Sequence, residues 1–174
     1  MNKAAYDAIE KIWYLTMKVR ARCPSSTDLM IGATGYRTAP WYQAHGIDLE
    51  VIFPKPLTKQ DIDDLNKMGE FVNRSFIINM VATLEEFGIL PKNTPPDISK
   101  NGGKLVKLAK LYRNHFAHGD WEFDPDDPDH QKTRAFLEKE LPIGASKGPG
   151  FVISIDTVLE PLKDGVLEYI RATT

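Results

Sequence analysis

A continuous amphipathic pattern over residues 57–88 constrains the fold of this chain more than any other feature. Apolar residues recur there every three or four positions, which is the period of an α-helix with one buried face. The stripe consists of Ile62, Leu65, Gly69, Val72, Phe76, Met80, Leu84 and Phe87. Between Phe76 and Ala82 nearly every position is apolar, as in a helix that is buried on most sides. The sequence therefore predicts a long central helix.

Polar residues mark the start and the middle of this helix. Thr58 followed by Asp61 resembles a capping box, in which each residue binds a backbone N–H of the other, although the usual partner is Glu or Gln. Asn73 lies on the apolar stripe, seven residues before Met80, so its amide needs a hydrogen-bond partner in the core. Asn73 either positions residues of a functional site through a hydrogen bond, or it is a self-satisfied residue at the edge of the core.

The same periodicity predicts four further helices, at residues 3–21, 104–118, 128–141 and 156–171. Their apolar positions include Ala5, Ile9, Ile12, Trp13 and Val19 in the first, Leu105, Leu108, Ala109, Tyr112 and Phe116 in the second, Phe136, Leu137 and Leu141 in the third, and Leu159, Leu162, Val166, Tyr169 and Ile170 in the last. Proline and glycine interrupt the pattern after residue 23, over residues 89–103 and in a glycine-rich joint at 142–150. The apolar FVISI before the last helix fits a short strand or an extended lead-in.

Residues 23–57 form an irregular segment, because proline and glycine punctuate it too often for a long helix. Ile47, Leu49, Val51 and Phe53 alternate with other residues, which permits a short strand, although no second strand is obvious. Nearby, Trp41, Tyr42 and His45, with Arg37, either form a base-stacking surface or cover the core under this segment.

The expected fold is an all-α, up-and-down bundle of about five helices, forming a single domain over residues 1–174 with an irregular segment at 23–57. The net charge of -2 leaves no global basic field, so a nucleic-acid surface would have to be local. One cysteine, Cys23, cannot form an intrachain disulfide, which points to a reducing, cytoplasmic location. The N-terminus lacks the pattern of a signal peptide, and no apolar run is long enough to cross a membrane.

Chemistry is concentrated where the helix at 104–118 ends. A dense polar cluster there contains Arg113, Asn114, His115, His118 and Asp120, with Gly119 placed to end the helix. In a continuous helix, residues five apart differ by about 140° and about 7.5 Å, so the side chains of Arg113 and His118 diverge unless the helix stops near Gly119. An arginine offers a planar fork for phosphate oxygens, and a histidine moves protons near neutral pH. Together they suffice for metal-independent RNA cleavage by the substrate's own 2′-hydroxyl.

The run Arg113-Asn114-His115-Phe116-Ala117-His118 resembles the R-x4–6-H motif of HEPN domains, including the polar residue directly after the arginine. HEPN domains are all-α bundles, commonly dimeric, and many are endoribonucleases in toxin–antitoxin and defence systems. The resemblance implies that Arg113 and His118 form the catalytic pair and that Asn114 orients them. It also implies a homodimer through the motif helices, which would bring two copies of the motif into one cleft, with a protein antitoxin or regulator as a further partner. No metal or other cofactor is expected.

Two hypotheses of function remain open. In the first, the protein is an endoribonuclease, and RNA is held by Lys104, Lys107, Lys110 and His115. In the second, it is a catalytically silent HEPN-like interaction module, which is favoured by Asp120 because toxin members often carry a tyrosine there. The lysine series also fits a solvated helix face, and the histidines could simply close the helix while Arg113 pairs with Asp120 or Glu122.

Two other motifs are weaker. The acidic loop at 124–130 ends in His130, but its spacing fits no EF-hand, and its carboxylates suit the start of a helix better than a metal. The lysine within GASKGPG lacks the spacing of a phosphate-binding P-loop, so this segment is interpreted as a linker.

Overall fold

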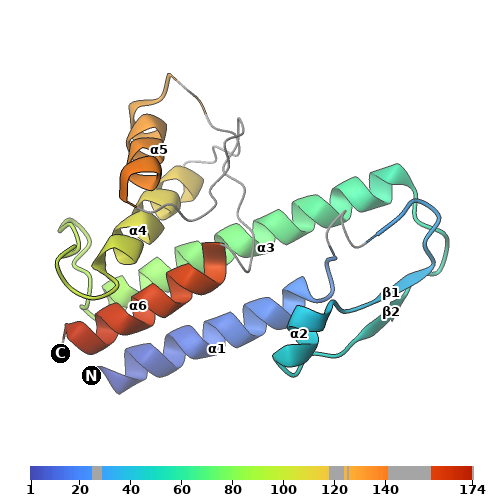
Figure 1. Cartoon of the computed structure of the whole chain (residues 1–174), viewed down its shortest axis with the longest axis horizontal. Helices are drawn as coiled ribbons and strands as arrows, with labels where there is room; N and C mark the ends of the chain where they lie inside the picture. The colour runs from blue at the N-terminus through green and yellow to red at the C-terminus, as the bar shows by residue number, and fades with distance from the viewer. Residues whose placement is uncertain (25–28, 118–123, 125, 141–157, 174) are drawn as a thin grey trace. The chain divides into compact units, whose positions relative to one another are not determined.

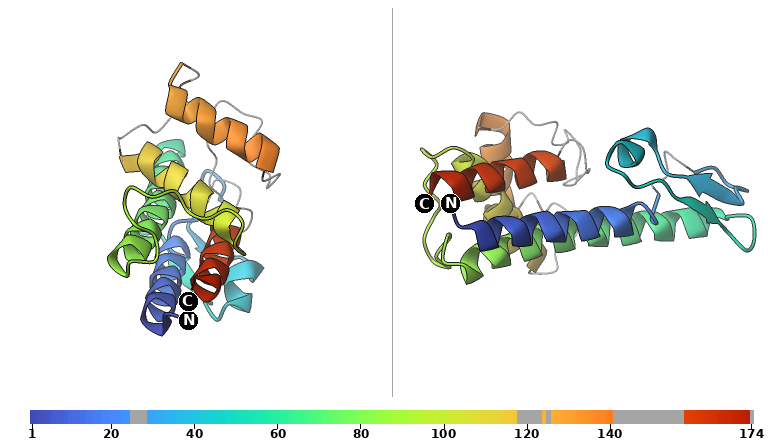
Figure 2. Two further views of the ribbon diagram at one scale, coloured as in Figure 1. Left: turned by 90° about the vertical axis from the view of Figure 1, so that its left-hand side faces the viewer. Right: turned by 90° about the horizontal axis from the view of Figure 1, so that it is seen from below.

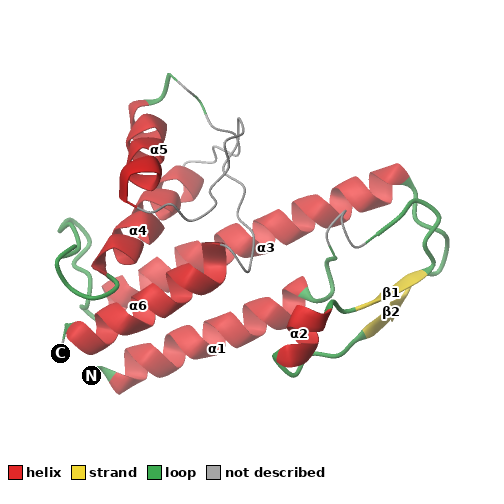
Figure 3. Cartoon of the chain, viewed as in Figure 1, coloured by secondary structure: helices red, strands yellow, loops and turns green. Residues whose placement is uncertain are grey.

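The computed structural model describes residues 1–24, 29–117, 124, 126–140 and 158–173. This part of the chain is mostly α-helical, which confirms the expected fold class (Figures 1 and 3). The helices are α1 (Lys3–Arg20), α2 (Pro40–Ala44), α3 (Lys59–Glu86), α4 (Gly103–Ala117), α5 (Pro128–Glu140) and α6 (Glu160–Ala172), and the strands are β1 (Gly35–Arg37) and β2 (Glu50–Ile52). Within the described ranges, no helix combines the length and the apolar character needed to span a membrane.

The long helices agree with the sequence-based predictions to within a few residues. The glycine-rich joint, the FVISI segment and the predicted helix start at Asp156 lie outside the described residues, so those predictions remain untested. The short helix α2 was not predicted, because five residues are too few to display a helical period.

Local sequence signals set both ends of α3. At its start the Thr58 N–H donates to Asp61 Oδ2 at 2.8 Å and the Asp61 N–H donates to Thr58 Oγ1 at 3.2 Å, so the capping box forms with aspartate in place of glutamate. At its end Gly88 adopts a φ of 67°, and the Ile89 N–H donates to Leu84 O at 3.0 Å. Phe87 does not belong to the buried stripe as predicted. It lies in this terminal turn and is 37 % exposed.

The chain divides into two compact units. Unit 1 comprises Met1–Ile12 and Arg74–Thr174, and unit 2 comprises Trp13–Asn73. Both boundaries fall inside a helix, one in α1 and one in α3. The single domain over residues 1–174 therefore stays a prediction, and each unit is described by itself below.

Unit 1 is held together by the apolar face of α6. All five apolar positions predicted for this helix are buried, which confirms its periodicity: Leu159, Leu162, Val166, Tyr169 and Ile170. Helix α6 contacts α4, and α4 also contacts α5. The start of α1 and the end of α6 lie close together and run in opposite directions (Figures 1 and 2), and Arg171 Nη2 donates to Tyr6 Oη at 2.8 Å.

The contact between α4 and α6 depends on glycine. Gly102, directly before α4, has a φ of 74°, and a Cβ atom added there would lie 1.8 Å from Gly165 O. At Gly165 itself, an added Cβ would lie 2.3 Å from Leu105 Cδ1. The backbones of the two helices approach so closely that neither glycine leaves room for a side chain.

Unit 2 contains two strands, of which the sequence predicted only the second. Strands β1 and β2 are antiparallel, with Tyr36 opposite Val51, so the strand expected near residue 51 has its partner in 35–37. The small core beside them consists of Leu29, Leu57 and Ile62, joined by the partly buried Ala33, Tyr36, Phe53 and Leu65. Tyr36 and Phe53 stack with their ring centroids 6.1 Å apart. Three-residue strands are too short for an alternating pattern to identify both partners.

Trp41, on α2, packs against the core of unit 2, whereas His45, directly after the helix, is exposed. The Trp41 ring meets the buried Trp13 edge-on, with the centroids 6.4 Å apart, and it also contacts Tyr42 and His45. For Trp41, this arrangement favours the interpretation that the ring covers the core rather than offering a base-stacking surface.

Candidate functional site

Arg113 lies in the last turns of α4 and forms an ion pair with Glu85 of α3. The hydrogen bond joins Arg113 Nη2 to Glu85 Oε1, and the two side chains are only 21 % and 18 % exposed. A carboxylate from another helix therefore holds the guanidinium in one orientation and offsets its charge. Asp120 and Glu122, the partners that the sequence suggested for Arg113, lie outside the described residues.

The lysines of α4 do not form a uniform basic track. Lys110 Nζ donates to the carbonyl oxygens of Lys92 and Thr94, both at 2.9 Å, and burial lowers the pKa of its ammonium group. Lys107 lies over the Phe136 ring, 4.5 Å from its centroid. Lys104 alone of the three is exposed. Two of the three lysines expected to bind RNA thus contribute to packing between helices and loops.

His115 lies in the interior and not on the surface expected for an RNA contact. It is 5 % exposed and hydrogen-bonds through Nδ1 to Nε2 of His130, which is 2 % exposed and comes from the first turn of α5. The two rings meet at 83° with centroids 3.9 Å apart. A side chain buried to this degree offers no face to a nucleic acid, so its place is in this histidine pair.

A backbone donor decides how protons are arranged in the pair. The Asp124 N–H donates to His130 Nδ1 at 2.9 Å, so this nitrogen is unprotonated. In a neutral ring the proton is then on His130 Nε2, which donates it to His115 Nδ1, and the remaining proton of His115 is on its Nε2. Protonating His130 at Nδ1 would replace an acceptor by a donor facing the Asp124 N–H. The Asp124 N–H therefore sets the direction of the hydrogen bond between the two rings.

The acidic loop serves as the start of α5. Asp127 Oδ1 accepts the N–H groups of Asp129 at 2.7 Å and His130 at 3.2 Å, which is the geometry of a helix N-cap. Asp124 Oδ1 accepts the Asp126 N–H at 2.8 Å in the same loop. Among the described residues no group of three or more His, Cys, Asp or Glu side chains could hold a metal ion. These contacts favour the helix-start interpretation over a metal site.

A small cavity of about 130 Å³ adjoins the histidine pair. It is lined by Leu111, Asn114, His115, Asp127, Asp129, His130 and Thr133. Asn114, expected beside the catalytic pair, thus lines this cavity together with both histidines. Arg113, its neighbour in sequence, is oriented toward Glu85 instead.

Replacement of the N-cap tests the electrostatics of this loop. Hydrogen bonds from the backbone N–H groups of His130 and Asp129 lower the pKa of the Asp127 carboxyl. Its stabilisation is therefore fully present above the unfolded-state pKa of about 4 and is lost as the pH falls through the lower folded-state pKa. We expect Asp127→Ala to lower the melting temperature at pH 7 more than Asp127→Asn, which keeps a capping oxygen. Both deficits should shrink toward pH 3, and a deficit of Asp127→Asn that does not depend on pH would contradict this assignment.

The remaining predicted residues are spread over the chain. Asn73 is 3 % exposed and lies on α3 in unit 2, so it is a core residue, and its role behind the site stays a prediction. His118, Gly119 and Asp120 lie outside the described residues. Sequence reasoning missed Glu85 and the pairing of His115 with His130. Glu85 lies 28 residues before Arg113, and no local sequence pattern links the two residues. His130 lies in the acidic loop, which was considered as a metal site and not as a partner of His115.

Comparisons of the chain with protein-family models, with curated proteins and with solved structures found no match.

Proposed function

We propose that this protein is a HEPN-like, metal-independent endoribonuclease. Arg113 would bind the scissile phosphate, His118 would act as general acid or base, and Asn114 would orient the pair. The proposal rests on the resemblance of residues 113–118 to the HEPN motif and on the mostly helical fold.

The observation that supports it best is the state of Arg113. Its guanidinium is oriented by Glu85, close to the end of α4 and to the exposed Asn114, and its side chain keeps 21 % of its surface accessible. A preorganised cation of this kind can stabilise charge that develops on phosphoryl oxygens without first reorganising. Its nitrogens other than Nη2 form no hydrogen bond to Glu85 and are available for a bidentate contact with a phosphate.

The proposed reaction needs only groups of the chain and of the RNA. A base accepts the proton of a 2′-hydroxyl, whose oxygen attacks the adjacent phosphorus. The bond from phosphorus to the 5′-oxygen breaks, and an acid returns a proton to that leaving oxygen. The products are a 2′,3′-cyclic phosphate and a 5′-hydroxyl. Arg113 would stabilise the added negative charge on the phosphoryl oxygens.

The experiment is to incubate the purified protein with single-stranded RNA in excess EDTA and to analyse the ends of the products. We expect cleavage that yields cyclic-phosphate and 5′-hydroxyl ends, and no cleavage of an RNA whose 2′-hydroxyls are methylated. A complete lack of cleavage across a varied set of RNAs would count against the enzyme and leave the interaction module. Cleavage that EDTA abolishes would contradict the metal-independent mechanism.

The second candidate, a catalytically silent interaction module, is favoured by a specific observation. Two cations of α4, one in the motif and one just before it, are already engaged within the chain: Arg113 with Glu85, and Lys110 with the carbonyl oxygens of Lys92 and Thr94. An RNA phosphate must therefore compete with Glu85 for Arg113. A purely structural ion pair would serve an interaction module equally well.

Neutralising Glu85 separates the two candidates. If Arg113 binds RNA phosphate, Glu85→Gln should raise the affinity for 2′-O-methyl RNA severalfold, because the competing carboxylate charge is removed. It should also lower the free energy of unfolding by roughly 1–3 kcal/mol, since a charge-assisted hydrogen bond is weakened. Glu86→Gln is the matched control, because Glu86 is the next residue of α3 and is exposed. Equal RNA affinities for the two variants, measured by fluorescence anisotropy, would favour the interaction module.

The homodimer through the motif helices also belongs to this proposal. Among the described residues, the large apolar side chains that are exposed do not include any from α4, so such a dimer would rely on polar contacts there. Light scattering at micromolar concentration is expected to give twice the chain mass. A monomer mass would remove the composite site from the proposal.

A further inference from the structure

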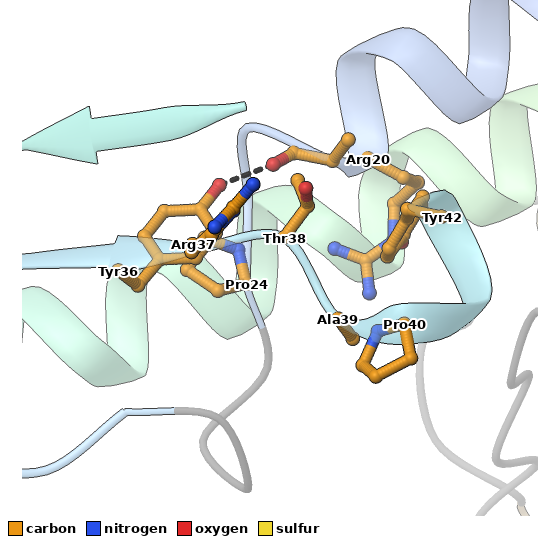
Figure 4. Close-up of a pocket in the computed structure, with 9 residues that line it drawn as sticks. Arg20, Pro24, Tyr36, Arg37, Thr38, Ala39, Pro40 and Tyr42 are labelled. Carbon is orange, nitrogen blue, oxygen red and sulfur yellow. Dashed lines mark hydrogen bonds between the residues drawn. The ribbon is translucent and has the colours of Figure 1, made fainter. Parts of the chain in front are cut away.

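A second cavity, of about 220 Å³, lies in unit 2, where α1 ends and β1 leads into α2 (Figure 4). It is lined by Arg20, Ala21, Pro24, Tyr36, Arg37, Thr38, Ala39, Pro40 and Tyr42. Two arginines contribute to this lining, and it includes no carboxylate. All of these residues belong to unit 2, so the cavity is separate in sequence and in composition from the cluster around Arg113.

Arg20 enters the cavity as the last residue of α1. Its Nη1 donates to Cys23 O, whereas its Nε is buried and has no hydrogen-bond partner in the described part of the chain. No carboxylate of the described residues lies within ion-pair distance of this guanidinium. Room for it is provided by Gly69 on α3, where an added Cβ would lie 2.2 Å from Arg20 Nη1. The charge of Arg20 is therefore not offset by a carboxylate in the described part of the chain, and the residue lines a cavity in which an anion can lie.

Arg37 reaches the same cavity from the end of β1. Its Nε and Nη2 bind Asp48 Oδ1 and Oδ2 at 2.9 and 2.6 Å, a bidentate ion pair that leaves Nη1 without a bond among the described residues. Asp48 offsets the charge of Arg37 but not that of Arg20. Of the two guanidinium charges that line the cavity, one is therefore left for a ligand to neutralise.

The hydroxyl groups of the lining add no negative charge. Burial raises the pKa of Tyr36 to about 12, so this phenol stays protonated at neutral pH and donates to Ala21 O. Thr38 Oγ1 donates to Ile47 O at 3.1 Å and accepts the Leu49 N–H at 3.0 Å. The available donors are thus the arginine nitrogens, which match the oxygens of a tetrahedral or planar oxyanion.

We propose that this cavity binds the phosphoryl group of a small phosphate monoester, with Arg20 as the principal contact and Arg37 as the second. A monoester carries close to two negative charges at neutral pH, because its second pKa is about 6. A phosphoryl group also presents three acceptor oxygens, which can accept from Arg20 and from Nη1 of Arg37 together, whereas a carboxylate presents only two. The volume is smaller than the roughly 300–1,000 Å³ of most organic-ligand sites, so the ligand is a small one or inserts only its phosphate end.

The test is isothermal titration calorimetry of the full chain at pH 7.5 with inorganic phosphate, AMP, adenosine and acetate. We expect phosphate and AMP to bind, with adenosine and acetate at least roughly tenfold weaker, since a lost charge-assisted bidentate contact costs about this factor. Binding of acetate as tight as that of phosphate would contradict the phosphoryl assignment. AMP tighter than phosphate would identify a nucleotide-like source, and equal affinity would identify free phosphate. If neither phosphate nor AMP binds, the proposal is overturned.

Substitutions of single arginines test whether phosphate binds in this cavity. Arg20→Gln and Arg37→Gln should each weaken phosphate binding roughly tenfold. Arg22→Gln should change it less than about twofold, because Arg22 is exposed, bonds to Lys18 O and does not line the cavity. Equal losses in all three variants would indicate only a general charge effect and would overturn the proposal.

Gly69→Ala moves the arginine without removing its charge. The new methyl carbon would lie 2.2 Å from Arg20 Nη1, too close for both atoms, and would displace the guanidinium. Alanine also favours the helix by about 1 kcal/mol over glycine. We expect weaker phosphate binding at an unchanged helical signal in circular dichroism, and unchanged binding would contradict the assigned place of Arg20. RNA cleavage should be unaffected by all of these variants, so this inference and the proposed ribonuclease function can fail independently.

Discussion

His118→Ala is expected to lower the rate constant of RNA cleavage in EDTA by about 10²–10⁴-fold, because general acid–base catalysis contributes an effect of this size. Arg113→Lys should lower it by about 10²–10³-fold, since lysine keeps the charge but loses the planar fork and its contact with Glu85. Single-turnover cleavage of a labelled single-stranded RNA measures both rate constants.

His45→Ala is the matched control for the histidine. His45 is exposed in unit 2, directly after α2, and its Nδ1 bonds to Trp41 O at 2.8 Å. We expect this variant to cleave RNA within about twofold of the wild-type rate, with all three variants giving the wild-type circular dichroism spectrum. If His118→Ala and Arg113→Lys retain the wild-type rate, any cleavage does not come from this motif, and the proposed catalytic pair is wrong.

Gly102→Ala is expected to lower the free energy of unfolding by about 2–5 kcal/mol. A part of this, about 1–2 kcal/mol, arises because a residue with a Cβ is strained at a positive φ. A further 1–3 kcal/mol or so arises because the new methyl group would overlap Gly165 O, an atom of the α6 backbone that cannot move aside as a flexible side chain could.

Gly88→Ala isolates the packing contribution. Gly88 also has a positive φ, of 67°, but a Cβ added there would meet nothing within 4 Å. The free energy of unfolding of this variant should therefore fall by only about 1–2 kcal/mol, the cost of placing a residue with a Cβ at a positive φ. Urea denaturation of both variants measures the difference. Equal losses would show that α4 and α6 do not approach each other at Gly102 as closely as described.

The sequence by itself determined the elements whose signals are local. The stripe of α6 is buried at each predicted position, and the Thr58–Asp61 capping box forms where it was expected. Each of these features is made by residues at most four positions apart, or by one helix face against a generic apolar core. Their energetics are therefore almost independent of which element packs against them.

The same locality explains where sequence reasoning went wrong. Phe87 continues the period of α3 but falls beyond the last helical residue, because Gly88 turns the chain there. His115 stood among polar residues and was expected to hold RNA, yet it is buried against a histidine that α5 supplies. A polar side chain can be buried when a residue of another element forms a hydrogen bond with it. The local sequence pattern does not identify that residue.

Only the tertiary structure decided the surroundings of the candidate sites. It set Glu85 against Arg113 across 28 residues of sequence, and it brought Arg20 and Arg37 to one cavity from the ends of a helix and a strand. The motif could name Arg113 as a phosphate-binding residue, but not the carboxylate that competes for it. The physical reason is that ion pairs and cavities depend on distances between packed elements. Periodicity and caps, in contrast, depend on the backbone geometry of a single element.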